Sequence, residues 1–425
     1  MKKKNRVIVT ASICLTILGL AGVWCAKQPA SFAASDARAR PSPQISNQVA
    51  NEKLVTANTK LTFKLFSEIL KKQHSENIFI SPASLAIALN IVYNGAGGET
   101  QEAIAKTLEL QGTNLQEINQ ANADLKASLK NPDPKVQLSI ANSLWTKESI
   151  PFKPEFLQII QNFYQAEVKN LNFSNPTAPS MINNWVNQST NGKINKIVDV
   201  IEPKTVFLML NAIYFKGNWT ESFPTEATQL HPFTLLDGTQ KQHPMMRHQN
   251  SASFPYYENE LFQAVSLPYG DGRMSMYIFL PNQGVSLKTF YEKLNAENWQ
   301  QWMNQFNNSD NSGGGVLISL PRFKLEYAID LKDTLKALGM EIAFTKEANF
   351  SGMTPSSIWI DKIQHKTFVE VNEEGTEAAA VTNVTSGVRS GPIEMNVNRP
   401  FFLAIRDNQT GNILFVGSIV EPKEE

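Results

Sequence analysis

The most unusual pattern in the chain lies near the C-terminus, in the run Glu373-Glu374-Gly375-Thr376-Glu377-Ala378-Ala379-Ala380-Val381-Thr382. This run follows a strand-like stretch, Lys366 to Val371, and leads into a polar segment. Loops are usually rich in Gly, Pro, Asn and Asp, whereas this run is mostly Ala, Thr and Val. Because the run has the composition of a strand and no evident partner strand, its backbone is available to form hydrogen bonds with a sheet. A helix that starts at Thr376 is the alternative interpretation.

Side-chain size along this run also suits a strand, whose side chains alternate between two faces. The even positions carry small, uncharged side chains: Thr376, Ala378, Ala380, Thr382, Val384 and Ser386. The early charge, Glu377, lies on the other face with Ala379. We therefore expect the segment to fit into an existing sheet with its small face toward the core. Gly375 precedes it as a hinge, because glycine reaches backbone conformations closed to other residues.

The run Glu-Glu-Gly-Thr-Glu-Ala-Ala-Ala resembles the reactive-loop hinge of the serpins, inhibitors that trap serine proteases. In serpins the bond that the protease cleaves follows the hinge glutamate at a nearly fixed distance. Counting from Glu373 puts this bond between Arg389 and Ser390, and Asn398-Arg399-Pro400-Phe401 follows at the family's usual distance. By the same resemblance the hinge consists of Glu373, Gly375, Thr376, Glu377, Ala378, Ala379, Ala380 and Thr382.

The resemblance also implies a partner and a mechanism. Arg389 is the only basic residue between Lys366 and Arg399. A lone Arg at this position resembles bait for a trypsin-like serine protease, whose acidic pocket pairs with a guanidinium. The protease would form an acyl-enzyme at Arg389, and the cleaved loop would insert from Thr376 onward into the main sheet.

Two other functions stay open for a chain of this kind. One is a non-inhibitory relative that acts as a binding or chaperone protein, and the other is a structural protein that uses the fold as a scaffold. The hinge favours inhibition, because its inserting face carries no charge and no Pro. Val381 is slightly larger than the Ala usual at that position, a small departure from the family pattern.

Further segments spread the resemblance over nearly all of residues 50–425. They are Asn77-Ile78-Phe79-Ile80-Ser81-Pro82-Ala83-Ser84, Asn183-Asn184-Trp185-Val186 with Gly192-Lys193-Ile194, Phe207 to Trp219, and Pro400-Phe401-Phe402. Ser81, Ser84, Asn211 and His365 match the polar cluster below the point where serpin strands part. Trp219 matches the aromatic residue near the top of the sheet. Without the match, His365 is interpreted as a hydrogen-bonded core histidine and Trp219 as a core tryptophan.

Composition and charge exclude several function classes. The 425 residues are 42% hydrophobic and 18% charged with a formal net charge of zero, so we expect no nucleic acid and no anionic membrane surface as a partner. The segment Asn114 to Lys130, where some serpins bind sulfated polysaccharide, is not basic, and no polysaccharide activator is expected. The histidines lack metal-ligand spacing and no Gly-x-Ser-x-Gly motif occurs. We therefore predict that the protein is not an enzyme and uses no metal or cofactor. We also expect a monomer.

A basic start followed by an apolar run from Val7 to Trp24 predicts a signal peptide over residues 1–33, cleaved after Ala33. An uncleaved membrane anchor and lipid attachment at Cys25 are the alternatives. The chain is accordingly expected to be secreted or periplasmic, or anchored to a membrane by this segment. Both cysteines, Cys14 and Cys25, lie in the leader, so the remaining chain can form no disulfide.

The rest of the chain divides into a flexible linker over 34–50 and a serpin-like domain over 51–425. The apolar stripe Leu61 to Leu70 predicts a helix that begins at Asn58 or Thr59, and Ser84 to Tyr93 predicts a buried helix. Met274 to Leu280 and Ile413 to Val420 predict strands. Because helices come early and strands late, the fold class is α+β: helices packed on large, mostly antiparallel sheets with an exposed reactive loop near the C-terminus.

Overall fold

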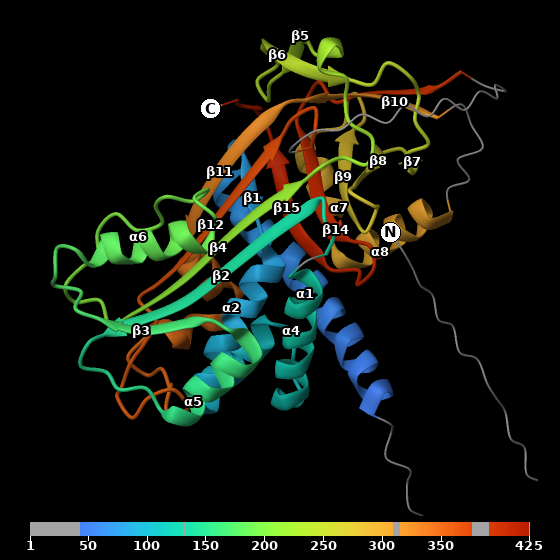
Figure 1. Ribbon diagram of the computed structural model, residues 1–425. Coiled ribbons are helices and arrows are strands. Elements are labelled where there is room, and N and C mark those ends of the chain that lie inside the picture. Colours follow the sequence, from blue (N-terminus) through green and yellow to red (C-terminus); the bar gives the residue numbers. More distant parts are fainter. Residues whose placement is uncertain (1–42, 131, 309–314, 376–390, 425) are drawn as a thin grey trace, which may run out of the picture. The chain divides into compact units, whose positions relative to one another are not determined.

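A five-stranded sheet (Figure 1) carries two of the residues predicted for the site, Asn211 and His365, on neighbouring strands. The computed structural model describes residues 43–130, 132–308, 315–375 and 391–424. The sheet has the order β11 (Phe323–Asp330), β12 (Lys362–Val371), β4 (Phe207–Gly217), β2 (Val136–Lys147) and β3 (Glu167–Leu171). β12 and β4 are parallel, as are β2 and β3, whereas the other neighbours are antiparallel. β4 is buried along nearly its whole length, as expected of an apolar strand that is covered on both faces.

Two further sheets complete the β structure of the described residues. The six-stranded sheet is antiparallel throughout and contains β1 (Ile78–Ile80), β15 (Ile413–Ile419), β14 (Phe401–Asp407), β9 (Met274–Pro281), β8 (Phe262–Tyr269) and β7 (Tyr256–Glu258) in this order. The four-stranded sheet contains β13 (Ile393–Asn396), β10 (Val316–Pro321), β6 (Gln240–Arg247) and β5 (Gln229–Thr234). The strands that flank the undescribed residues 376–390, β12 and β13, belong to different sheets.

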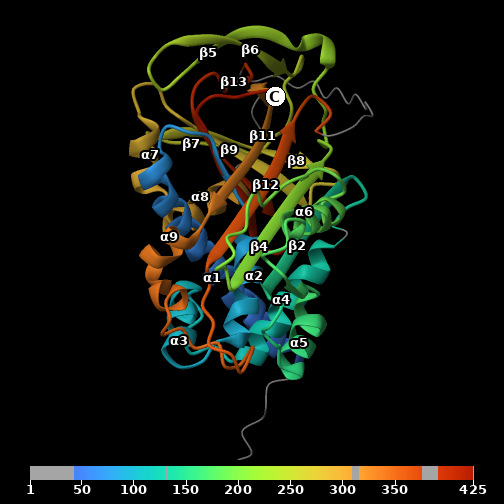
Figure 2. The ribbon, with the colours of Figure 1, turned by 90° about the vertical axis from the view of Figure 1, so that its left-hand side faces the viewer.

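Helices lie on both faces of the five-stranded sheet (Figure 2), and others pack against the six-stranded sheet. Their bounds are α1 (Pro43–Gln73), α2 (Pro82–Gly95), α3 (Gly98–Thr107), α4 (Leu115–Leu129), α5 (Pro154–Ile159), α6 (Ala178–Ser189), α7 (Leu287–Lys293), α8 (Ala296–Asn308) and α9 (Lys332–Leu335). Four short π or 3-10 turns occupy Ile160–Tyr164, Thr225–Ala227, Lys336–Met340 and Glu341–Phe344. α2 is buried almost completely between the sheets, while α6 packs apolar side chains against β2 and β4 on the opposite face.

The structure confirms most of the predicted elements. α2 covers the predicted helix Ser84 to Tyr93, β9 covers Met274 to Leu280, and β15 covers most of Ile413 to Val420. The predicted start of the first helix is wrong, because α1 begins at Pro43 and passes through both proposed cap residues. Thr59 shows why its side chain misleads: its hydroxyl donates to the carbonyl of Val55, one turn earlier within the helix, at 2.8 Å.

The described chain from Pro43 onward forms one compact unit, and the predicted leader 1–33 lies outside the described residues. α1 overlaps the stretch 34–50 for which a flexible linker was predicted. Of the helices that the structure describes, none combines the length and the apolar character needed to cross a membrane.

Candidate functional site

The seam between β12 and β4 is a parallel ladder. It runs from the pair Lys362–Leu208 to the pair Phe368–Tyr214. Both strands continue beyond the last pair, β12 to Val371 and β4 to Gly217, where each is paired with its outer neighbour, β11 or β2. Parallel pairs are slightly less stable per residue than antiparallel ones. The seam is therefore a weak line within this sheet, and it lies beside the point where the predicted hinge begins.

The chain reverses direction immediately after β12. Asn372 and Gly375 form a bridge across this turn, and the amide of Gly375 donates to the carbonyl of Asn372 at 3.2 Å. Gly375 has a φ of 85°, in the left-handed region that only glycine enters freely. A Cβ atom at this position would lie 2.3 Å from the amide nitrogen of Trp219 and 2.4 Å from the carbonyl oxygen of Gly217. The turn thus needs glycine both for its conformation and for its close approach to β4.

Trp219, which the resemblance placed near the top of the sheet, holds this turn against the end of β4. Its amide donates to the carbonyl of Glu374 at 3.1 Å, and its indole Nε1 donates to the carbonyl of Asn372 at 2.9 Å. The indole ring stacks on Tyr269 with 4.3 Å between ring centroids. Because one side chain is bonded to the turn and packed on a neighbouring sheet, the turn has a fixed position.

The predicted hinge residue Glu373 is buried, with 6% of its surface exposed. Its Oε1 accepts a hydrogen bond from the Thr228 hydroxyl at 2.7 Å and lies 3.5 Å from a guanidinium nitrogen of Arg322. Its carbonyl accepts from the amide of Phe223 at 2.8 Å. A buried carboxylate needs such partners, because burial of an unpaired charge is costly. Glu373 therefore ties the turn to two other parts of the chain, the 223–228 segment and Arg322.

A row of polar side chains crosses the seam lower down. Asn142 on β2, Asn211 on β4 and His365 on β12 are direct cross-strand neighbours. Asn211 Nδ2 donates to Asn142 Oδ1 at 2.5 Å, and Asn211 Oδ1 accepts from His365 Nδ1 at 2.6 Å. The last of these hydrogen bonds connects the two strands of the seam and must break if they separate.

The N-terminus of α2 completes this polar row. Ser84 Oγ accepts from Asn211 Nδ2 at 2.6 Å, and the Ser81 hydroxyl donates to the carbonyl of Leu414 on β15 at 2.6 Å. The Ser81 amide donates to His365 Nε2 at 3.0 Å, so Nε2 carries no proton and the ring is neutral. Burial lowers the pKa of His365 to about 3, because desolvation disfavours the imidazolium ion. The four predicted residues of the sheet-opening cluster are thus in contact with one another.

Three participants were missed from the sequence: Asn142, Thr228 and Arg322. One feature of the sequence could have pointed to Asn142, because it is a single amide inside the otherwise apolar and small run Ile140 to Leu144. Thr228 and Arg322 gave none, because their contacts depend on how three separate segments meet. The predicted hinge residues Thr376 to Thr382 and the predicted reactive bond, Arg389 and Ser390, lie outside the described residues.

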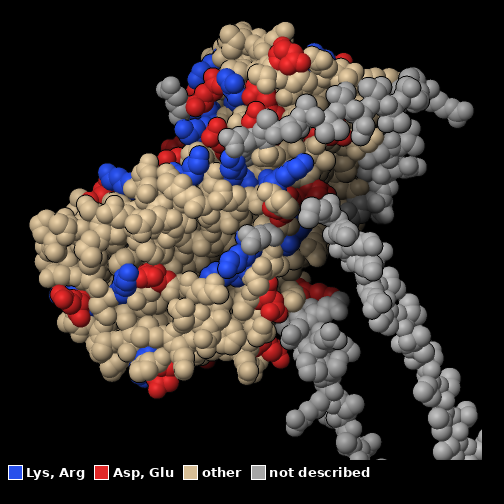
Figure 3. All heavy atoms as spheres, in the orientation of Figure 1, with Lys and Arg blue, Asp and Glu red and all other residues tan. Residues whose placement is uncertain are grey.

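Within the part of the chain that the structure describes, no group of three or more His, Cys, Asp or Glu side chains could hold a metal ion. Figure 3 shows acidic and basic side chains interspersed on the face seen in Figure 1, without one large basic patch. This pattern agrees with the formal net charge of zero.

An α+β fold with three sheets, in which the segment after β12 departs beside a parallel seam, defines the serpin fold. The chain belongs to the serpin family, since the family described as "Serpin (serine protease inhibitor)" matches residues 56–422. Human Serpin B4 is 36% identical over 391 residues, which cover 87% of this chain and 99% of the relative. The bovine leukocyte elastase inhibitor is 35% identical over 382 residues, covering 87% of this chain and all of the relative.

Solved structures agree with this assignment. The thermophilic serpin tengpin in its native state matches with a TM-score of 0.77 and 30% identity, over 93% of this chain and 97% of that one. Human thyroxine-binding globulin in complex with thyroxine matches with a TM-score of 0.80 and 27% identity, over 88% of this chain and all of that one. The predicted family and fold class are therefore confirmed.

Proposed function

We propose that this serpin is a suicide inhibitor of an Arg-directed, trypsin-like serine protease. The protease cleaves the bond between Arg389 and Ser390, and the freed segment from Thr376 onward enters the five-stranded sheet between β12 and β4. The protease is trapped as an acyl-enzyme while the loop inserts.

The direction of the chain at the turn is the observation that carries this proposal. β12 and β4 are parallel, and the chain turns back at Gly375 directly after β12. A segment that continues from this turn along the seam runs antiparallel to both strands. Insertion would therefore replace one parallel pairing with two antiparallel ones, the more stable kind. β12 and β4 contain 10 and 11 residues, a length that the segment from Thr376 to Arg389 can match.

The chemistry requires only the protease's own catalytic groups. The protease serine attacks the carbonyl carbon of Arg389, forming an ester, and the amide bond to Ser390 breaks. The nitrogen of Ser390 takes the proton of the serine hydroxyl through the protease's histidine and leaves as a new amino terminus. Hydrolysis of the ester would free the protease, so trapping requires that insertion be faster than attack by water.

Two sets of contacts oppose insertion in the intact protein. At the top of the seam, Trp219 and Glu373 hold the turn in place. Lower down, the hydrogen bond between His365 and Asn211 joins the two strands. Insertion adds ladder hydrogen bonds and buries the small side chains of the loop, and both contributions arise only when the loop inserts. The native state is then held by a kinetic barrier and not by being the most stable arrangement.

The direct test mixes residues 34–425 with trypsin and examines the products on a denaturing gel. We expect a stable band at the combined size of trypsin and the loop-cleaved chain. The Arg389→Ala variant should lose this band while keeping the circular dichroism spectrum of the parent protein. Cleavage after Arg389 that leaves trypsin fully active would refute the proposal.

A second candidate is a binding protein of the same fold, favoured by the structural similarity to thyroxine-binding globulin. A carrier needs the fold but not the trap. The same gel separates the two functions, because a carrier would be cleaved as a substrate and form no covalent product.

A further inference from the structure

The Arg322 side chain contacts both the turn after β12 and the tail, which is residues 420–424 at the end of the described chain. One edge of its guanidinium, Nε with one terminal nitrogen, contacts Glu424 Oε1, with the Nε hydrogen bond at 2.6 Å. The other terminal nitrogen lies 3.5 Å from Glu373 Oε1. The guanidinium therefore bridges a half-exposed carboxylate of the tail, 42% exposed, and the buried carboxylate of the turn, 8% exposed.

Hydrogen bonds fix the backbone around Arg322, so only the conformation of its side chain determines where the guanidinium points. Its amide donates to the carbonyl of Pro244 at 3.0 Å, and its carbonyl is bonded to the His243 ring. Arginine has a long, flexible stem, but its planar fork restricts orientation once two of its donors are engaged by one carboxylate. The contact with Glu424 restricts the orientation of the Arg322 guanidinium in this way.

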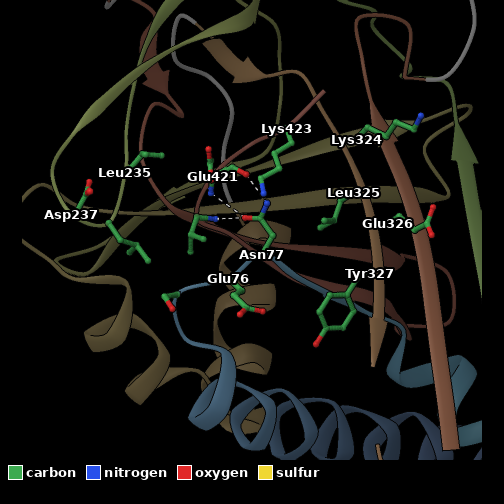
Figure 4. A pocket seen from close by; sticks show the side chains of 13 residues that line it. Glu76, Asn77, Leu235, Asp237, Lys324, Leu325, Glu326, Tyr327, Glu421 and Lys423 are labelled. Carbon is green, nitrogen blue, oxygen red and sulfur yellow. Dashed lines mark hydrogen bonds between the residues drawn. The ribbon is translucent and has the colours of Figure 1, made fainter. Parts of the chain in front are cut away.

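The tail that carries Glu424 is itself anchored, as Figure 4 shows beside a hollow of about 700 Å³. Asn77 Oδ1 accepts from the amides of Val420 and Glu421 at 2.8 and 3.0 Å, and Asn77 Nδ2 donates to the carbonyl of Glu421. The amide of Lys324 donates to the carbonyl of Lys423 at 2.6 Å. Glu424 is thus held next to the start of β11, where Arg322 is located.

We propose that Glu424 is a positioning residue: it orients Arg322 so that the guanidinium holds Glu373 and, through Glu373, the turn from which the reactive loop departs. Without Glu424 the Arg322 side chain turns toward solvent, and among the described residues the buried Glu373 carboxylate keeps only the Thr228 hydroxyl as a side-chain partner. The tail then regulates the rate at which the loop enters the sheet, an effect that rests on the proposed inhibitory function.

The primary test is hydrogen exchange in the native protein, which does not depend on loop insertion. The amide of Phe223 is bonded to the Glu373 carbonyl and that of Trp219 to the Glu374 carbonyl. In Glu424→Ala we expect both amides to exchange about two- to fivefold faster, the size of effect expected for a partly exposed ion pair. Spontaneous conversion to the loop-inserted form on mild heating should accelerate by a similar factor.

The chain offers a matched control on the same tail. The Glu421 carboxylate pairs with Lys241 at 2.9 Å, and no described contact joins it to Arg322. Glu421→Ala should leave exchange at Phe223 and Trp219 unchanged. In an Arg322→Ala background, Glu424→Ala should have no further effect, because the proposed action passes through the guanidinium.

Three results would overturn the proposal: unchanged exchange in Glu424→Ala, equal acceleration in Glu421→Ala, or a full Glu424 effect that persists without Arg322. A failure of the inhibitory function has a different signature. In that case the loop-cleaved parent protein gains no thermal stability over the intact one, while the exchange experiment still decides the role of Glu424.

Discussion

Replacement of Gly375 by alanine tests whether the turn after β12 is held against β4. Gly375 has a φ of 85°, and the added Cβ would lie within 2.6 Å of three backbone atoms in the 217–219 segment. The Cβ meets backbone and not the movable end of a side chain. We therefore expect the turn to move away from Trp219, which weakens the hydrogen bonds to Glu374 and Asn372.

The structure allows the size of this effect to be estimated. A left-handed conformation costs an alanine about 1 to 2 kcal/mol. The two hydrogen bonds of Trp219 contribute about 1 kcal/mol each. The native, uncleaved state should therefore lose about 3 to 4 kcal/mol, measured from the urea dependence of its near-ultraviolet circular dichroism.

Gly284 provides the matched control for this substitution. Its φ is 83°, and a Cβ there would meet nothing within 4 Å. Gly284→Ala should therefore cost only the conformational part, about 1 to 2 kcal/mol. Equal losses in the two variants would refute the reasoning, because the close approach between the turn and β4 would then contribute nothing to native stability.

Four further predictions follow from the seam, the loop and the leader. As pH falls from about 6.5 toward 3, His365 binds a proton in the unfolded chain but stays neutral in the folded one, whose His365 pKa is about 3. The folded state therefore loses up to about 1.4 kcal/mol of stability per pH unit over this range. Urea midpoints measured across the range should fall less steeply in His365→Gln. Asn142→Ala removes the partner of a buried Asn211 donor and should lower the free energy of unfolding by about 1 to 2 kcal/mol in urea titrations, whereas no change would mean that water replaces the bond. Thr376→Arg should turn the inhibitor into a substrate, and covalent trapping that persists on a gel would contradict insertion. If the predicted leader is cleaved after Ala33, N-terminal sequencing of the mature protein should begin at Ala34, and a blocked or intact N-terminus would favour an anchor or a lipid.

Sequence reasoning reached the family because several motifs are spread along the chain and each depends on local composition. Buried elements with a clear apolar pattern, such as α2 and β9, were predicted close to their observed bounds. The start of α1 was not, because Thr59 is a good cap residue in general but here bonds back to Val55 within a longer helix. Local propensity does not reveal a helix that continues upstream.

The site itself was predictable only where the family pattern already grouped its residues. Ser81, Ser84, Asn211 and His365 lie together as the pattern implied, but Asn142 joins them through a strand register that no local rule supplies. Arg322 and Glu424 are 102 positions apart and meet only because β11 begins beside the tail. Contacts of this kind follow from topology, so they became visible only in the folded chain.

The chemistry of the seam gives a physical reason for its polar row. Apolar side chains that interlock across two strands would leave a cavity in any arrangement with a strand between them, and cavities are costly in a packed core. Asn211 and His365 instead meet through one directional hydrogen bond, which can be exchanged for a bond to another partner. Because such groups must stay paired when buried, they also hold the closed arrangement firmly until a new partner is available. Under the proposed mechanism the inserted strand provides that partner, so the row both closes the intact sheet and permits it to open.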